Sequence, residues 1–125
     1  MEVLKPKKTI LLLDKDNRIL SVVDDMMYPG NFDIHIIFDP NSIYHKAKDL
    51  KPDLVILDYL LLNNACAQIC HDFKEDNELR STPLIVATAY KSKKTREEAY
   101  KCDALFLKPL DISLFASTME YLTAS

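Results

Sequence analysis

The stretch KPDLVILDYLL, residues 51 to 61, contains a charged residue where a buried strand is expected. From Leu54 to Tyr59 every residue is apolar or aromatic except Asp58. Burying a carboxylate whose partner is missing costs about 3–5 kcal/mol. Asp58 is therefore either a surface residue by chance or the end of a buried strand that presents a carboxylate.

The composition of the chain is typical of one soluble globular domain, which we expect to span 1–125. Its 16 basic and 19 acidic residues give a net charge of −3, so neither nucleic acid nor an anionic membrane is expected as a direct partner. The longest apolar run is far too short to cross a membrane. Three cysteines without the spacing of a disulfide framework favour reduced thiols and a cytoplasmic location.

Five short apolar runs predict five strands, and segments with helical spacing separate them. The first, third and fourth runs are nearly continuous in Leu, Ile and Val, as in parallel strands that are covered on both faces. The second run alternates in part, which suits an edge strand. The pattern predicts an α/β fold, a doubly wound parallel sheet with right-handed crossovers. The runs are 9–14, 32–38, 53–58, 83–88 and 104–107.

Five helices are expected between and after these strands. Asp16, Asp39 with Pro40 behind it, and Asp111 are each placed to begin a helix. The fourth helix, 92–101, is charged almost throughout, so we expect it to be loosely held. The third helix carries an apolar stripe of Ala65, Cys66, Ile69, Cys70 and Phe73.

Polar residues stand at the carboxyl ends of four predicted strands, namely Asp14, Asp58, Thr88 and Lys108. In doubly wound folds, ligands bind along that edge of the sheet. Carboxylates hold hard cations such as magnesium, whereas hydroxyl and ammonium groups contact phosphate oxygens. Each residue taken singly also has an ordinary interpretation as a strand-end or turn residue. Together they predict a site for a magnesium ion and a phosphoryl group.

The chain resembles a response-regulator receiver domain of the CheY-like superfamily over essentially its whole length. The stretches that carry the resemblance are ILLLDKD (10–16), PDLVILD (52–58), PLIVATA (83–89) and LKP (107–109). The resemblance implies a flavodoxin-like, five-stranded parallel sheet of order 2-1-3-4-5 with five helices. It also implies a role in two-component signal transduction, in which the domain accepts a phosphoryl group and signals by a conformational change.

By that resemblance Asp58 is the phosphoacceptor, which attacks the phosphohistidine of a sensor histidine kinase or a phosphotransfer protein. Asp14 and Asp58 hold a magnesium ion together with the main-chain carbonyl of Leu60. Thr88 hydrogen-bonds the phosphoryl group, and Lys108 pairs with it. The domain is then no enzyme beyond its own phosphorylation from a donor and its own dephosphorylation.

Three features depart from the family's pattern. Lys15 replaces the second of two adjacent acids, and its charge should weaken magnesium binding. Asp16 is a substitute ligand through a water, although capping a helix is its simpler role. The loop after Asp58 lacks the usual proline and glycine. Leu105 stands where an aromatic residue that moves inward on activation is common, so the readout of phosphorylation should differ.

Two further groups of residues have a functional and an ordinary interpretation. A downstream protein is expected on the face formed by the fourth helix, the fifth strand and the fifth helix. Four residues there either form an aromatic-apolar patch or belong in part to the core. Cys66, Cys70 and His71 have a spacing that can touch a metal, but packing is the simpler interpretation. The four residues of the patch are Tyr90, Tyr100, Phe106 and Leu110.

Two alternative functions stay open. A pseudo-receiver, a binding module that keeps the fold without phosphotransfer, is favoured by Lys15 and Leu105 and opposed by the complete phosphoryl site. A haloacid-dehalogenase-like phosphohydrolase would use Asp14 as nucleophile and Asp16 as acid–base. That family's acidic fourth motif is missing, and the alternative leaves Asp58 without a role.

Overall fold

The computed structural model of the protein describes residues 8–14, 32–59, 65–89, 92–98, 102–108 and 111–123. Its strands are β1 (Lys8–Leu13), β2 (Phe32–Ile37), β3 (Leu54–Asp58), β4 (Leu84–Thr88) and β5 (Ala104–Leu107). Its helices are the 3-10 helix η1 (Pro40–Ser42) and the α-helices α2 (Ile43–Leu50), α3 (Cys66–Glu75), α4 (Lys93–Glu98) and α5 (Ile112–Thr123).

The strands form one parallel sheet in the order β2-β1-β3-β4-β5, which confirms the predicted fold class and strand order. β1 pairs with both β2 and β3, so the strand order reverses beside β1. Ligands in doubly wound folds bind outside the carboxyl ends of the strands near such a reversal. The topology therefore places the expected ligand site at the ends of β1 and β3.

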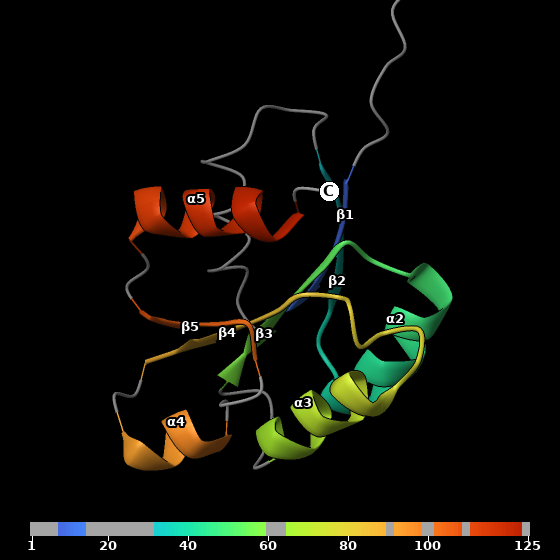
Figure 1. Ribbon diagram of the computed structural model, residues 1–125, viewed down its shortest axis with the longest axis horizontal. Helices are drawn as coiled ribbons and strands as arrows, with labels where there is room; N and C mark the ends of the chain where they lie inside the picture. Colours follow the sequence, from blue (N-terminus) through green and yellow to red (C-terminus); the bar gives the residue numbers. More distant parts are fainter. Residues whose placement is uncertain are drawn as a thin grey trace, which may run out of the picture.

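Helices cover the sheet on both faces, with α2 and α3 on one side and α5 on the other (Figure 1). Side chains of a strand point alternately to the two faces. In β1, Leu11 and Leu13 belong to the core cluster under α2 and α3, whereas Ile10 and Leu12 belong to the cluster under α5. All four are fully buried. Burial on both sides explains why the central strands are continuous apolar runs.

The start of α2 follows the predicted capping by Asp39. The Asp39 Oδ1 atom accepts a hydrogen bond from the backbone N–H of Asn41 at 2.9 Å, and the chain first makes η1 before it enters α2. The helix ends at Lys51, whose left-handed backbone (φ 50°, ψ 60°) is a conformation that few non-glycine residues adopt. Because the chain has glycine only at Gly30, a lysine takes the turn that usually falls to glycine.

The apolar stripe predicted for the third helix faces the core, and so do apolar residues of the fifth helix. Cys66, Ile69, Cys70 and Phe73 of α3 are buried. In α5, Phe115 and Met119 are buried, and the Oδ1 atom of Asp111 accepts the backbone N–H of Leu114 at 3.0 Å. Both helices therefore pack on the core with their apolar residues, and α5 begins after Asp111 as predicted.

The burial of Phe106 in β5 decides between the two interpretations of this residue. Its ring lies 5.0 Å from the ring of Phe115 in an edge-to-face contact, and the side chain is buried in the cluster under α5. Phe106 is thus a core residue and not part of a surface patch. Tyr90, Tyr100 and Leu110 lie outside the described residues.

Other expectations also fall outside the described part of the chain. These are the helix that Asp16 was expected to begin and the end of the fourth helix beyond Glu98. Within the described residues, none of the helices has the length and apolar character needed to cross a membrane.

Candidate functional site

Four polar residues lie at one edge of the sheet because the strands are parallel. Asp14 directly follows β1, Asp58 is the last residue of β3, Thr88 is the last residue of β4, and Lys108 directly follows β5. All four are the residues that the strand-end pattern predicts. Their strands are neighbours in the sheet, so the backbone brings together residues up to 94 positions apart.

Asp14 and Asp58 are neighbours across the β1–β3 pair. Leu13 pairs with Leu57, and each carboxylate follows one residue later on its own strand. The backbone N–H of Asp14 donates to the carbonyl of Ile37 at 3.2 Å, which holds Asp14 against β2 on its other side. Asp14 is only 1% exposed and Asp58 only 4%. Two carboxylates therefore lie side by side at the reversal of strand order, with little access to water.

Lys108 pairs with Asp58 inside this edge. Its Nζ atom lies 3.1 Å from Asp58 Oδ1, and the two side chains are 19% and 5% exposed. The backbone N–H of Lys108 also donates to the carbonyl of Thr88 at 2.8 Å, which positions the lysine beside the end of β4. Asp58 is thus a buried carboxylate with an ammonium partner. Asp58 is therefore the end of a buried strand and not a surface residue by chance.

Thr88 lies one step beyond the residue that pairs with Asp58. Asp58 pairs with Ala87, so Thr88 follows at the end of the neighbouring strand. It is 1% exposed. A hydroxyl group here can donate to an anion at the sheet edge, because a threonine hydroxyl carries one donor hydrogen.

The pair Asp14 and Asp58 fits part of a magnesium site. Magnesium is commonly held by one or two carboxylates while waters and phosphate oxygens complete its shell. The described part of the chain contains no group of three or more His, Cys, Asp or Glu residues that could hold a metal ion. The other predicted ligands, Asp16 and the Leu60 carbonyl, lie outside the described residues, as does Lys15.

Three further residues that the sequence pattern singles out take part in packing. Leu105 is partly buried against the cluster under α2 and α3. Cys66 and Cys70 are fully buried in that cluster, as the packing interpretation expects, whereas His71 is exposed. Burial raises the pKa of Cys102, which packs on the same cluster, to about 11 and keeps this thiol protonated at neutral pH.

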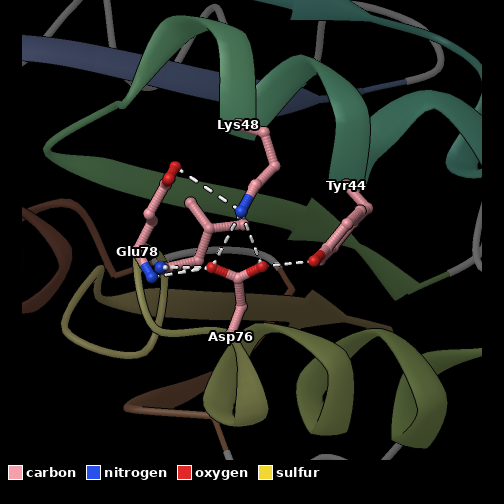
Figure 2. Close-up of polar contacts among 5 residues, drawn as sticks. Tyr44, Lys48, Asp76 and Glu78 are labelled. Atoms are coloured by element: carbon pink, nitrogen blue, oxygen red, sulfur yellow. Dashed lines mark hydrogen bonds and ion pairs between the residues drawn. The ribbon is translucent and has the colours of Figure 1, made fainter.

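A polar cluster between α2 and the loop after α3 was not predicted (Figure 2). Asp76 accepts hydrogen bonds from the Tyr44 hydroxyl and from Lys48 Nζ, the latter at 2.9 and 3.2 Å. It also accepts the backbone N–H groups of Glu78 and Leu79 at 2.7 and 3.1 Å. The hydrogen bond from Tyr44, followed by that from Lys48, lowers the pKa of Asp76 well below its usual range.

An open groove of about 630 Å³ lies beside this cluster. It is lined by Tyr44, Lys48, Asp72, Glu75, Asp76, Asn77 and Glu78. The spacing of Tyr44 and Lys48, one helical turn apart, indicates that they share a face of α2. Nothing in the sequence indicates that Asp76 receives both, because it lies 32 and 28 residues further along the chain. The cluster joins α2 to the end of α3 and lies apart from the four strand-end residues.

The sequence comparisons identify response regulators as relatives. No family model matches the chain. The chain is 22% identical over 115 residues to the polar-differentiation response regulator DivK of Brucella anthropi, and the alignment covers 90% of this chain and 94% of that protein.

Solved receiver domains have the same fold. A putative response regulator from Chloroflexus aurantiacus matches with a TM-score of 0.81 at 14% identity, over 96% of this chain and 100% of that one. The receiver domain of the sensor histidine kinase PA1611 from Pseudomonas aeruginosa, solved with a magnesium ion coordinated in its active site cleft, matches with a TM-score of 0.79 at 16% identity and the same coverage. A manganese-bound form of the response regulator Rcp1 matches with a TM-score of 0.70 at 15% identity, over 92% of this chain and 91% of that one. The relatives and the sheet order support the resemblance of the chain to response-regulator receiver domains, and the solved structures show that it has their fold.

Proposed function

We propose that the protein accepts a phosphoryl group on Asp58 from a sensor histidine kinase or a phosphotransfer protein and signals by a conformational change. The observation that carries this proposal is the contact between Asp58 and Lys108, a nearly buried carboxylate and a partly buried ammonium group at the ends of two strands. Asp58 ends β3, which pairs with β1 beside the reversal of strand order, and ligands in doubly wound folds bind near such a reversal.

The proposed reaction is a nucleophilic displacement at phosphorus. A carboxylate oxygen of Asp58 attacks the phosphoryl group of a phosphohistidine, so an oxygen–phosphorus bond forms while the phosphorus–nitrogen bond breaks. The imidazole of the donor leaves, and the product is an aspartyl phosphate. Asp58 supplies the nucleophile, and the kinase or phosphotransfer protein supplies the phosphoryl group.

Lys108 and Thr88 then bind the transferred group. The new phosphoryl oxygens compete for the Lys108 ammonium, which at present contacts Asp58 Oδ1. Phosphorylation turns the Asp58 carboxylate into an uncharged acyl group and puts the negative charge on the phosphoryl oxygens. Lys108 therefore moves its contact to the phosphoryl group, because a hydrogen bond to a charged acceptor is stronger than one to a neutral acceptor. The Thr88 hydroxyl donates a second hydrogen bond. The exchange of partners at Lys108 begins the conformational signal.

A divalent cation, which we propose to be magnesium, would be held by Asp14, Asp58 and the Leu60 carbonyl, with Asp16 as a substitute ligand through a water. When bound, it neutralises negative charge on the phosphoryl oxygens. The chain's own residues bring two acids together at the edge where such an ion is needed. Lys15 should weaken the binding of the ion.

The downstream protein target is proposed to bind the face of α4, β5 and α5. Exposed Leu107 of β5 and exposed Leu114 of α5 support an apolar contact there. We further propose that the domain acts in the cytoplasm, without catalysis beyond its own phosphorylation and dephosphorylation, and without direct contact to nucleic acid or membrane.

The position of the phosphate tests the proposal. The protein is incubated with acetyl phosphate and magnesium, the aspartyl phosphate is reduced with borohydride, and the reduced residue is identified by peptide mass spectrometry. We expect reduction at Asp58. Reduction at Asp14 would instead support the haloacid-dehalogenase-like alternative, and reduction at neither residue would support a pseudo-receiver.

A further inference from the structure

Phe38 is an exposed aromatic residue at the same edge of the sheet as the proposed phosphoryl site. It directly follows β2, and its side chain is 63% exposed. The carbonyl of Ile37, the residue before it, accepts the backbone N–H of Asp14 at 3.2 Å. Phe38 is therefore next to Asp14, on the side away from Asp58.

The backbone on both sides of Phe38 is fixed. Ile37 is held by β1, with which it pairs at Leu13. On the other side, Asp39 accepts the backbone N–H of Asn41 on its carboxylate and the N–H and hydroxyl of Ser42 on its carbonyl. An exposed aromatic side chain on a fixed backbone loses little conformational freedom when a partner covers it, which favours binding.

Phe38 lies close to the strand that ends at Asp58, compared with the size of a protein interface. β2 and β3 are separated by β1 alone, so two strand spacings of about 4.8 Å put Phe38 at about 10 Å from the line of β3. A typical interface covers about 800 Å² of each partner, which corresponds to a disc of about 16 Å radius. A protein donor centred on Asp58 therefore covers Phe38, whereas a small-molecule donor does not reach it.

We propose that Phe38 is an anchor contact for the protein that delivers the phosphoryl group, and that it fits an apolar depression beside the donor's phosphohistidine. This inference rests on the proposed function of Asp58. Large aromatic side chains dominate the binding energy of interfaces when they fill a pocket near the centre. Phe38 then sets the affinity for the donor and leaves the chemistry at Asp58 unchanged.

The experiment compares two kinds of donor. The histidine kinases of the source organism are phosphorylated with labelled ATP, and its phosphotransfer proteins receive the label from a phosphorylated kinase or receiver domain. The protein that transfers to the wild-type chain with the highest kcat/KM is the protein donor. Acetyl phosphate is the small donor. The variants are Phe38→Ala, Phe38→Leu and the control Tyr121→Ala. Tyr121 is an exposed aromatic at 81% and lies near the end of α5, the helix on the face of the sheet opposite α2 and α3 (Figure 1).

We expect Phe38→Ala to lower kcat/KM for the protein donor about fivefold or more, mainly through KM, because truncating an anchor residue has at least that effect. Phe38→Leu should keep much of the wild-type kcat/KM for the protein donor, and Tyr121→Ala should leave it unchanged. Acetyl phosphate should label all variants at the wild-type rate. Unchanged transfer from the protein donor, or an equal loss with acetyl phosphate, would overturn the inference.

The remaining outcomes separate this inference from the proposed function. If acetyl phosphate labels Asp58 but no protein donor transfers to the wild-type chain, the role of Phe38 is wrong and the role of Asp58 stands. If the wild-type chain is labelled by neither donor, the proposed function fails, and this inference fails with it.

Discussion

The ammonium nitrogen of Lys108 lies 3.1 Å from Oδ1 of Asp58, although 50 residues separate them in sequence. The contact joins the ends of β3 and β5, which lie on either side of β4. It stabilises a carboxylate that the apolar strand would otherwise bury without an ammonium partner. The same lysine is the group that an arriving phosphoryl group would attract.

Replacing Lys108 should destabilise the fold through Asp58. Loss of one partner of a buried ion pair costs about 3–5 kcal/mol, and we expect about 2–3 kcal/mol for Lys108→Met because Lys108 is partly exposed. Urea unfolding at neutral pH measures the effect. The control is the double variant Lys108→Met with Asp58→Asn, which removes the buried charge and should recover most of the stability. Equal stability of the single and double variants would show that Asp58 does not depend on this lysine.

The polar cluster at Asp76 should contribute a pH-dependent part of the stability. Its pKa is lowered in the folded protein relative to the ordinary value of 3.8, chiefly by the Tyr44 hydroxyl and then by Lys48. A carboxyl group with a lowered folded pKa stabilises the protein above its unfolded pKa, and this contribution is lost as the pH falls towards the folded value. Asp76→Asn should therefore be less stable than wild type at pH 7, and the gap should narrow as the pH falls below about 5.

Urea unfolding from pH 7 down to pH 3 checks this, with Tyr44→Phe as the matched variant. Tyr44→Phe removes one hydrogen bond but keeps the contact of Lys48 with Asp76, so its pH-dependent loss should be smaller. A gap between wild type and Asp76→Asn that stays constant over the whole range would contradict the assignment.

Lys15→Asp should restore the second acid of the family's pattern. Asp14 and Asp58 already lie side by side and nearly buried, so a third carboxylate raises their mutual repulsion without a metal and strengthens binding of a divalent cation. We expect tighter magnesium binding by calorimetry and a lower melting temperature without metal. Lys15 lies outside the described residues, and magnesium affinity equal to wild type would mean that it points away from the site.

The strands and the site were predictable for a shared physical reason. Central parallel strands are buried on both faces, so their sequences are continuous apolar runs. A charged residue at the end of such a run is easily recognised. Asp58 after LVIL is the clearest case. Once the strands are known to be parallel, Asp14, Thr88 and Lys108 follow as residues of the same edge.

Individual hydrogen bonds between distant residues outside the site were not predictable. The carboxylate of Asp53 accepts the backbone N–H of Thr9 at 2.7 Å, and that of Asp103 accepts the N–H of Leu84 at 2.7 Å. Both acids follow no local pattern, because their partners are fixed only when the strands pair. The sequence left Phe106 open between core and surface for the related reason that a strand of four residues shows too little periodicity to tell its core side from its exposed side.

The central claim is that Asp58 accepts one phosphoryl group in a reaction that depends on a divalent cation. Intact-protein mass spectrometry after incubation with acetyl phosphate tests it most directly, with wild type and Asp58→Asn compared in magnesium and in a chelator. We predict one added phosphoryl group on wild type in magnesium, little in the chelator, and none on Asp58→Asn. Uptake of acid-labile phosphate by Asp58→Asn at the wild-type level, or no uptake by wild type in magnesium, would contradict the account.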